Sequence, residues 1–175
     1  MVCSLDGIIA KPDNSVSWFE TKDHYENGVE AQDQEELERS IDCYVMGSKT
    51  YEHAMELSKQ YGWVFGVKPT IVVTNRNLQD DRANIEFFSG ELISLVNEKL
   101  KPSYNNVWVV GGSLLIRDFI RHNLADEICM NILPIILGDG IPFFNQIRKE
   151  QVLHLKDNIA YKNGMLELRY EILKK

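Results

Sequence analysis

Two predicted strand-to-helix turns contain the residues whose types and spacing could do chemistry. The apolar run 107–110 ends at Gly111-Gly112, and from Ser113-Leu114 onward the apolar residues recur on one face of a helix. The first amides of a helix have no partner within it and lie at the positive end of its dipole, so they attract anions. Glycine lets a ligand approach the backbone closely. The pattern predicts an anion site here, and the alternative is a plain tight turn.

A second turn of the same kind follows the apolar run 41–46, where Gly47 is succeeded by Ser48-Lys49-Thr50 and another helical stretch. A third buried strand, 70–74, ends at Thr74 and is followed by Arg76. In a parallel sheet the carboxyl ends of such strands meet at one edge, where ligands bind.

Two anion-receptive turns together with Lys49 and Arg76 suit a ligand with several phosphates, such as a dinucleotide. A guanidinium pairs with phosphate through two parallel hydrogen bonds, so Arg76 suits an extra terminal phosphate. The alternative is that both cations are solvated surface charges. The glycine patterns of a Rossmann domain and of a P-loop are absent from the sequence.

The elements that must position these turns alternate along the first two thirds of the chain, and the last third is antiparallel. The expected strands are 41–46, 70–74, 84–88, 107–110, 126–133, 151–155 and 164–172, and the expected helices are 23–40, 51–59, 91–100 and a stretch from 113. This order predicts an α/β fold, with a mostly parallel central sheet flanked by helices and an antiparallel C-terminal hairpin. A chain of 175 residues is predicted to form one domain, 1–175.

Two carboxylates are candidates for catalysis. Asp6 lies in a turn after the first short strand, and Asp23 comes five residues after Trp18, just beyond the possible helix N-cap Thr21. Either acid could orient a substrate or relay a proton. The alternative for Asp6 is a turn-forming role, and for Asp23 a first-turn acid that complements the helix dipole.

Composition excludes several other classes of function. A net charge of −7 and a pI near 5.1 argue against a nucleic-acid partner or an acidic membrane surface. Three widely spaced cysteines and four scattered histidines form neither a disulfide framework nor a metal site. Without a signal peptide or a long apolar run, the sequence predicts a soluble cytoplasmic protein without a membrane partner.

Four stretches in register resemble the dihydrofolate-reductase-like superfamily. They are 4–10 (SLDGIIA), 47–52 (GSKTYE), 109–113 (VVGGS) and 134–144 (PIILGDGIPFF). Within that superfamily the chain is most similar to the bacterial reductase domain of riboflavin biosynthesis and its stand-alone relatives. The resemblance covers nearly the whole chain.

The resemblance implies NADPH as cofactor, a small-molecule substrate and a homodimer. The residues that it assigns to the cofactor are Ile8, Ile9, Ala10, Gly47, Ser48, Lys49, Thr50, Thr74, Arg76, Gly111, Gly112, Ser113 and Leu114. Ile8, Ile9 and Ala10 would wall the nicotinamide, and Arg76 with Lys49 would favour the 2′-phosphate. Relatives often carry a cis peptide at the glycine pair.

The activity most implied is reduction of a small heterocycle, 5-amino-6-(5-phosphoribosylamino)uracil. The spacing of Trp18 and Asp23, the predicted substrate-binding residues, is similar to that of the Trp and substrate acid of dihydrofolate reductases, which makes dihydrofolate reduction the alternative. A non-catalytic NADPH-binding module and a structural dimerisation protein are further alternatives.

Overall fold

The structure is a computed structural model, and it describes residues 1–30 and 39–174. The chain, predicted as one domain, divides into two compact units that we name by their positions in the sequence. The outer unit is Met1–Asp33 with Arg117–Lys175, and the inner unit is Gln34–Ile116. In the described part of the chain, no helix has the length and apolar character needed to cross a membrane.

The inner unit is built on a four-stranded parallel sheet in the order β5-β4-β3-β6. Its strands are β3 (Cys43–Gly47), β4 (Thr70–Val73), β5 (Ile85–Phe88) and β6 (Val107–Gly111). They coincide with predicted strands and differ from them by no more than two residues at either end. The central strand β3 is buried from Cys43 to Met46, as its continuous apolar sequence predicts.

Alternate residues of the central strands face opposite sides of this sheet. Tyr44, Met46 and Val72 join a core cluster with Tyr51 of helix α2 (Ser48–Tyr61), which packs on β3 and β4. Cys43, Val45 and Ile71 are also buried, but lie outside that cluster. The helical stretch expected at 91–100 forms as α3 (Leu92–Ser94), the π-helical η1 (Leu95–Leu100) and α4 (Lys101–Ser103).

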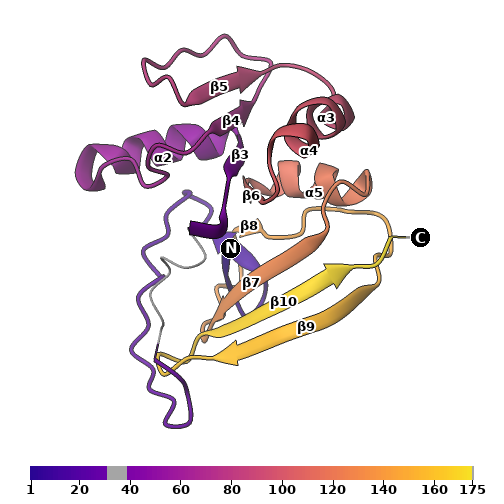
Figure 1. Cartoon of the computed structure of the whole chain (residues 1–175). Helices are drawn as coiled ribbons and strands as arrows, with labels where there is room; N and C mark the ends of the chain where they lie inside the picture. The colour runs from indigo at the N-terminus through magenta and orange to yellow at the C-terminus, as the bar shows by residue number, and fades with distance from the viewer. Residues whose placement is uncertain (31–38, 175) are drawn as a thin grey trace. The chain divides into compact units, whose positions relative to one another are not determined.

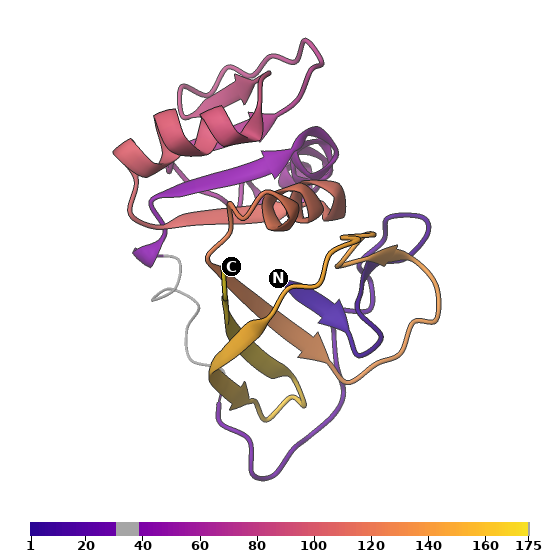
Figure 2. The same cartoon turned by 90° about the vertical axis from the view of Figure 1, so that its right-hand side faces the viewer.

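The outer unit contains a mixed sheet in the order β1-β7-β10-β9 and a small antiparallel pair, β2 with β8. Its strands are β1 (Val2–Ser4), β2 (Ile8–Ala10), β7 (Glu127–Leu133), β8 (Ile141–Pro142), β9 (Leu153–Ala160) and β10 (Leu166–Ile172). The predicted C-terminal hairpin is β9 with β10, coloured yellow in Figures 1 and 2. Helix α5 (Ser113–Arg121) spans the sequence boundary between the units.

The α/β class, the parallel sheet and the antiparallel hairpin are therefore confirmed, with the strands distributed over three sheets. The helix expected at 23–40 is wrong over residues 23–30, residues 39–40 are helical as expected, and 31–38 lie outside the described part of the chain.

Backbone pairing explains why residues 23–30 are not helical. The amides of Tyr25 and Val29 donate to the carbonyls of Lys162 and Ala160, so they are not available to helical bonds. Gly28 allows this close approach, because a Cβ there would lie 2.5 Å from the backbone of Tyr161. Tertiary pairing overrides the local helical pattern here.

Candidate active site

The carboxyl ends of β3, β4 and β6 meet at one edge of the inner sheet, as the sequence predicts. Gly47 is in register with Val73, the last residue of β4, and Met46 is in register with Gly111. Most of the cofactor-binding candidates therefore lie at or directly after the ends of neighbouring strands of one sheet. They are Gly47, Ser48, Lys49, Thr50, Thr74, Arg76, Gly111, Gly112, Ser113 and Leu114. We call this group the glycine edge.

Two helices begin at the glycine edge. Helix α2 starts directly after Gly47, which makes no side-chain capping bond to its first amides. Helix α5 starts after Gly112, whose carbonyl accepts the first helical bond from the amide of Ile116, at 3.1 Å. The first-turn amides of both helices thus have no carbonyl partner in their own helix, which is the arrangement that binds anions.

The two glycine turns lie close together. A Cβ on Gly47 would stand 3.8 Å from the carbonyl oxygen of Gly111 and 3.9 Å from the amide nitrogen of Gly112. A Cβ on Gly112 would stand 3.3 Å from the Thr50 hydroxyl. The peptide between Gly111 and Gly112 is cis, and φ of Gly111 is 121°. The absent side chains leave a backbone-lined cradle, which fits the phosphates of a dinucleotide.

Arg76 lies beside helix α2. Its Nη2 is 2.6 Å from Oε1 of Glu52, and both side chains are about half exposed. The bond from Arg76 lowers the pKa of the Glu52 carboxyl, and the charge of Lys49 lowers it further. The turn that carries Arg76 is held by Thr74, whose hydroxyl accepts the Arg76 amide at 3.1 Å. Lys49, Glu52 and Arg76 thus form one charged cluster.

A buried network holds the segment that follows Arg76. The Tyr51 hydroxyl donates to Asp80 Oδ2 at 2.6 Å, and Arg82 pairs with the same carboxylate while its guanidinium covers the Trp63 ring at 4.0 Å. The bond from Arg82 holds the pKa of Asp80 far below its usual range, and burial with the Asp80 bond raises that of Tyr51 to about 12. This network holds Asp80 and Arg82 beside Tyr51 of helix α2.

The remaining candidates belong to the outer unit. Ile8, Ile9 and Ala10 form the half-buried strand β2, which pairs with β8. A Cβ on Gly140 would lie 2.2 Å from the Ala10 carbonyl oxygen, so the glycine lets the 138–140 segment close on β2. Their predicted contact with a nicotinamide stays a prediction.

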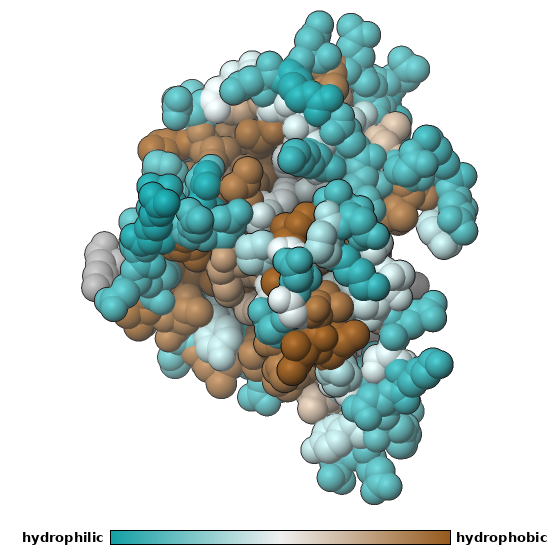
Figure 3. All heavy atoms as spheres, turned by 180° about the vertical axis from the view of Figure 1, so that it is seen from behind, coloured by the Kyte–Doolittle hydropathy of each residue, from teal (hydrophilic) through white to brown (hydrophobic). Residues whose placement is uncertain are grey.

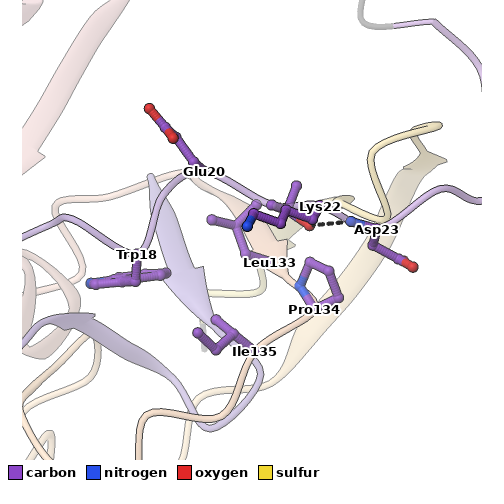
Figure 4. Close-up of a pocket in the computed structure, with 8 residues that line it drawn as sticks. Trp18, Glu20, Lys22, Asp23, Leu133, Pro134 and Ile135 are labelled. Carbon is purple, nitrogen blue, oxygen red and sulfur yellow. Dashed lines mark hydrogen bonds between the residues drawn. The ribbon is translucent and has the colours of Figure 1, made fainter.

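A cavity of about 450 Å³ lies in the outer unit, lined by Trp18, Glu20, Thr21, Lys22, Asp23, Leu133, Pro134 and Ile135 (Figure 4). Trp18 is 6% exposed, and its indole Nε1 is buried without a hydrogen-bond partner among the described residues. An indole ring beside three apolar residues at the end of β7 suits a flat heterocycle.

Trp18 and Asp23 line opposite ends of this cavity, and the Asp23 carboxylate points away from the indole (Figure 4). The carboxylate faces the hairpin turn, where a Cβ on Gly164 would lie 2.2 Å from Asp23 Oδ2. The amide of Asp23 donates to the Thr21 hydroxyl at 3.1 Å, so Thr21 closes a local turn. No helix begins there in residues 21–30, so Thr21 is not a helix N-cap. The role of Asp23 as substrate acid or catalytic residue stays a prediction.

Asp6 has a set of partners that supports the turn-forming alternative. Its carboxylate accepts the Ser4 hydroxyl at 2.5 Å and the amides of Leu137 and Gly138 at 3.1 and 2.8 Å. These bonds, first the one from Ser4, lower its pKa to about 2. A carboxyl that stays ionised at neutral pH is a poor proton donor. Asp6 therefore ties the 137–138 segment to the first turn.

We expect Asp6→Asn to lower the melting temperature at pH 7 and to matter less as the solution is acidified. The folded pKa is about 2 against an ordinary 3.8, so the stabilisation is full above about pH 4 and is lost as pH falls toward 2. Thermal unfolding at pH 7, 4 and 2.5 measures this difference. Asp81→Asn, which alters an exposed carboxylate, is the control. A difference from wild type that grows in acid would contradict the assignment.

Sequence reasoning missed Glu52 as a site residue, and it missed the cavity residues Glu20, Lys22, Leu133, Pro134 and Ile135. Glu52 lies three residues after Lys49, so helical spacing already places the two on one face. The pairing of Glu52 with Arg76 depends on how α2 packs against β4, which no local pattern encodes.

Comparison with known proteins identifies the family. The family model of the RibD C-terminal domain matches residues 1–166. The chain belongs to the RibD C-terminal domain family. The mixed α/β fold with its parallel sheet agrees with that of RibD-like reductases.

Two relatives match the chain over most of its length. It is 30% identical over 155 residues to the uncharacterized protein YwjB of Bacillus subtilis (strain 168), covering 87% of this chain and 84% of that protein. A putative riboflavin biosynthesis protein from Shewanella sp. PV-4 shares the fold with a TM-score of 0.83 and 22% identity, covering 99% of this chain and 97% of the other.

A two-function enzyme also shares the fold. It is the diaminohydroxyphosphoribosylaminopyrimidine deaminase/5-amino-6-(5-phosphoribosylamino)uracil reductase of Thermotoga maritima, with a TM-score of 0.67 and 16% identity. The match covers 98% of this chain and 55% of that one. The chain thus corresponds in fold to about half of the longer enzyme.

Proposed function

We propose that this protein is an NADPH-dependent reductase of a small heterocyclic substrate, most specifically of 5-amino-6-(5-phosphoribosylamino)uracil. The observation that supports this most strongly is the glycine edge, where two helix starts and the Lys49–Arg76 cations follow neighbouring strands. Membership of the RibD C-terminal domain family supports the reductase class.

The residues of the glycine edge would hold the cofactor by its phosphates. The first-turn amides of α2 and α5 would donate to the pyrophosphate, the glycines would admit it to the backbone, and Arg76 with Lys49 would pair with the 2′-phosphate. When bound, NADPH supplies a hydride from its nicotinamide. The chain's own contribution is to bind and orient the reactants, which by itself lowers a reaction barrier substantially.

The cavity beside Trp18 would take the substrate. The indole and the side chains of Leu133, Pro134 and Ile135 would supply flat and apolar walls for a pyrimidine ring. Among the residues that line this cavity, all of them described, Lys22 is the one cation, and its ammonium points toward the Trp18 side (Figure 4). It suits the phosphate of a phosphoribosyl group. No comparable feature favours dihydrofolate, because Asp23 turns away from Trp18.

Titration of the purified protein with NADPH, followed by turnover with the ribosylamino-pyrimidine and with dihydrofolate, tests this function. We expect NADPH binding and oxidation of NADPH with the pyrimidine. Binding of NADPH without turnover of either substrate would favour the non-catalytic module instead. Absence of nucleotide binding would overturn the proposal and favour the structural alternative.

We also propose a homodimer that works in the cytoplasm. Large apolar side chains are exposed in both units, among them Val67 at 89% and Val152 at 52%. Apolar patches among hydrophilic residues are visible on the face shown in Figure 3. Burying such side chains in an interface is favourable. Light scattering after size exclusion measures the mass against the 20.2 kDa of one chain, and a monomer at micromolar concentration would contradict the dimer.

A further inference from the structure

The charged cluster of Lys49, Glu52 and Arg76 contains an acid that phosphate recognition alone does not require. Two cations would attract a 2′-phosphate, but Glu52 occupies one end of the Arg76 fork, Nη2 to Oε1 at 2.6 Å. The lowered pKa of Glu52 keeps this carboxylate ionised at neutral pH. Any phosphate that approaches Arg76 therefore meets a negative charge beside it.

Exposure makes the Arg76–Glu52 pair easy to open. The two side chains are 55% and 45% exposed, and such pairs contribute little net stability. Arg76 can thus turn from Glu52 to a phosphate at small cost. The repulsion between Glu52 and a doubly charged phosphate remains after that turn, and it opposes the gain from Arg76.

The same carboxylate has a use when the phosphate is absent. In many dinucleotide sites an acidic residue accepts the hydrogen bond of the ribose 2′-hydroxyl, which only the unphosphorylated nucleotide carries. Glu52 lies one helical turn after Lys49, at the helix start assigned to the cofactor phosphates. It is therefore close to the cation that would meet the 2′-position.

We propose that Glu52 is a specificity-determining residue that weakens the preference for NADPH and lets the glycine edge accept NADH as well. This inference rests on the proposed function, since it concerns the same cofactor site. Arg76 attracts a 2′-phosphate and Glu52 repels it, whereas Glu52 can accept a hydrogen bond from a 2′-hydroxyl. The site therefore discriminates only modestly between NADPH and NADH.

The test measures the dissociation constants of NADPH and NADH by calorimetry for wild type and Glu52→Gln. Glutamine keeps an oxygen that can accept from Arg76 but removes the charge. We expect the ratio Kd(NADH)/Kd(NADPH) to rise about five- to tenfold, the effect of one charge near a doubly charged phosphate in water. Glu56→Gln, one turn further along α2 and paired with Lys59, is the matched control and should leave the ratio unchanged.

Adenosine 2′-phosphate and inorganic phosphate extend the test to ligands without a nicotinamide. Glu52→Gln should strengthen the binding of adenosine 2′-phosphate by a similar factor. Inorganic phosphate should not compete with NADPH for the site at equal concentration. A ratio that stays within twofold of wild type, or falls, would overturn the role of Glu52 while NADPH binding itself persists. Failure of every variant to bind either nucleotide would instead overturn the proposed function, and this inference with it.

Discussion

Replacing Gly112 with valine is expected to weaken NADPH binding about 100-fold, equivalent to about 2.7 kcal/mol. A Cβ at this position would already be 3.3 Å from the Thr50 hydroxyl, and the two methyl groups of valine extend further into the cradle. They would cover amides that the phosphates need. Calorimetric titration with NADPH measures the loss.

The fold should survive this change, because Gly112 is only partly buried and the atom that a Cβ there would meet is the hydroxyl at the end of the Thr50 side chain. We expect the melting temperature to fall by no more than about 5 °C, and Gly112→Ala to give an intermediate loss of affinity. Retention of wild-type NADPH affinity by a folded Gly112→Val protein would rule out the glycine pair as a phosphate site.

Replacing Arg76 with alanine is expected to raise the Kd of NADPH about 10- to 100-fold and that of NADH less than about threefold. The difference arises because a charge-assisted pair with the 2′-phosphate contributes about 1.5–3 kcal/mol, and NADH lacks that phosphate. Loss of Arg76 also leaves Glu52 unpaired beside the phosphate, so the Arg76→Ala, Glu52→Gln double variant should regain part of the NADPH affinity.

The matched control for Arg76 is Lys59→Ala. It removes the same charge from the last turn of α2, where Lys59 pairs with Glu56. A general electrostatic effect would weaken the binding of both NADPH and NADH in both variants. Equal weakening of NADPH and NADH by Arg76→Ala would show that Arg76 does not read the 2′-phosphate.

The parallel sheet of the inner unit was predictable because its strands are continuous apolar runs that end at glycine or at polar residues. The runs 41–46 and 107–110 correspond to β3 and β6, and the glycines that follow them occupy adjacent strand ends. A short continuous apolar run that is bounded by turn residues is typical of a strand covered on both faces. The position of the glycine edge followed from these runs together with the glycines and helical stretches that come after them.

The segments that were not predicted correctly depend on partners far away in the sequence. The 23–30 segment has helical spacing, but its backbone pairs with the hairpin turn through Val29 and Lys162. Strand β8 is two residues long and contains a proline, so no local pattern marks it. Asp6 shows the same limit, because its amide partners at 137 and 138 lie more than 130 residues away. Sequence patterns locate elements but do not show which loops close on each other.

The division of the chain also has a consequence for how it folds during synthesis. The inner unit is one continuous stretch, whereas the outer unit joins both ends of the chain. Strand β1 is made first, but its partner is β7, with Val2 beside Asn131. The inner unit has therefore left the ribosome before β1 can pair, and such long-range strand pairing is slow. We expect protease resistance to appear first in the inner unit. Until β7 is made, β1 is an unpaired strand, and it is the point at which the nascent chain is most exposed to aggregation.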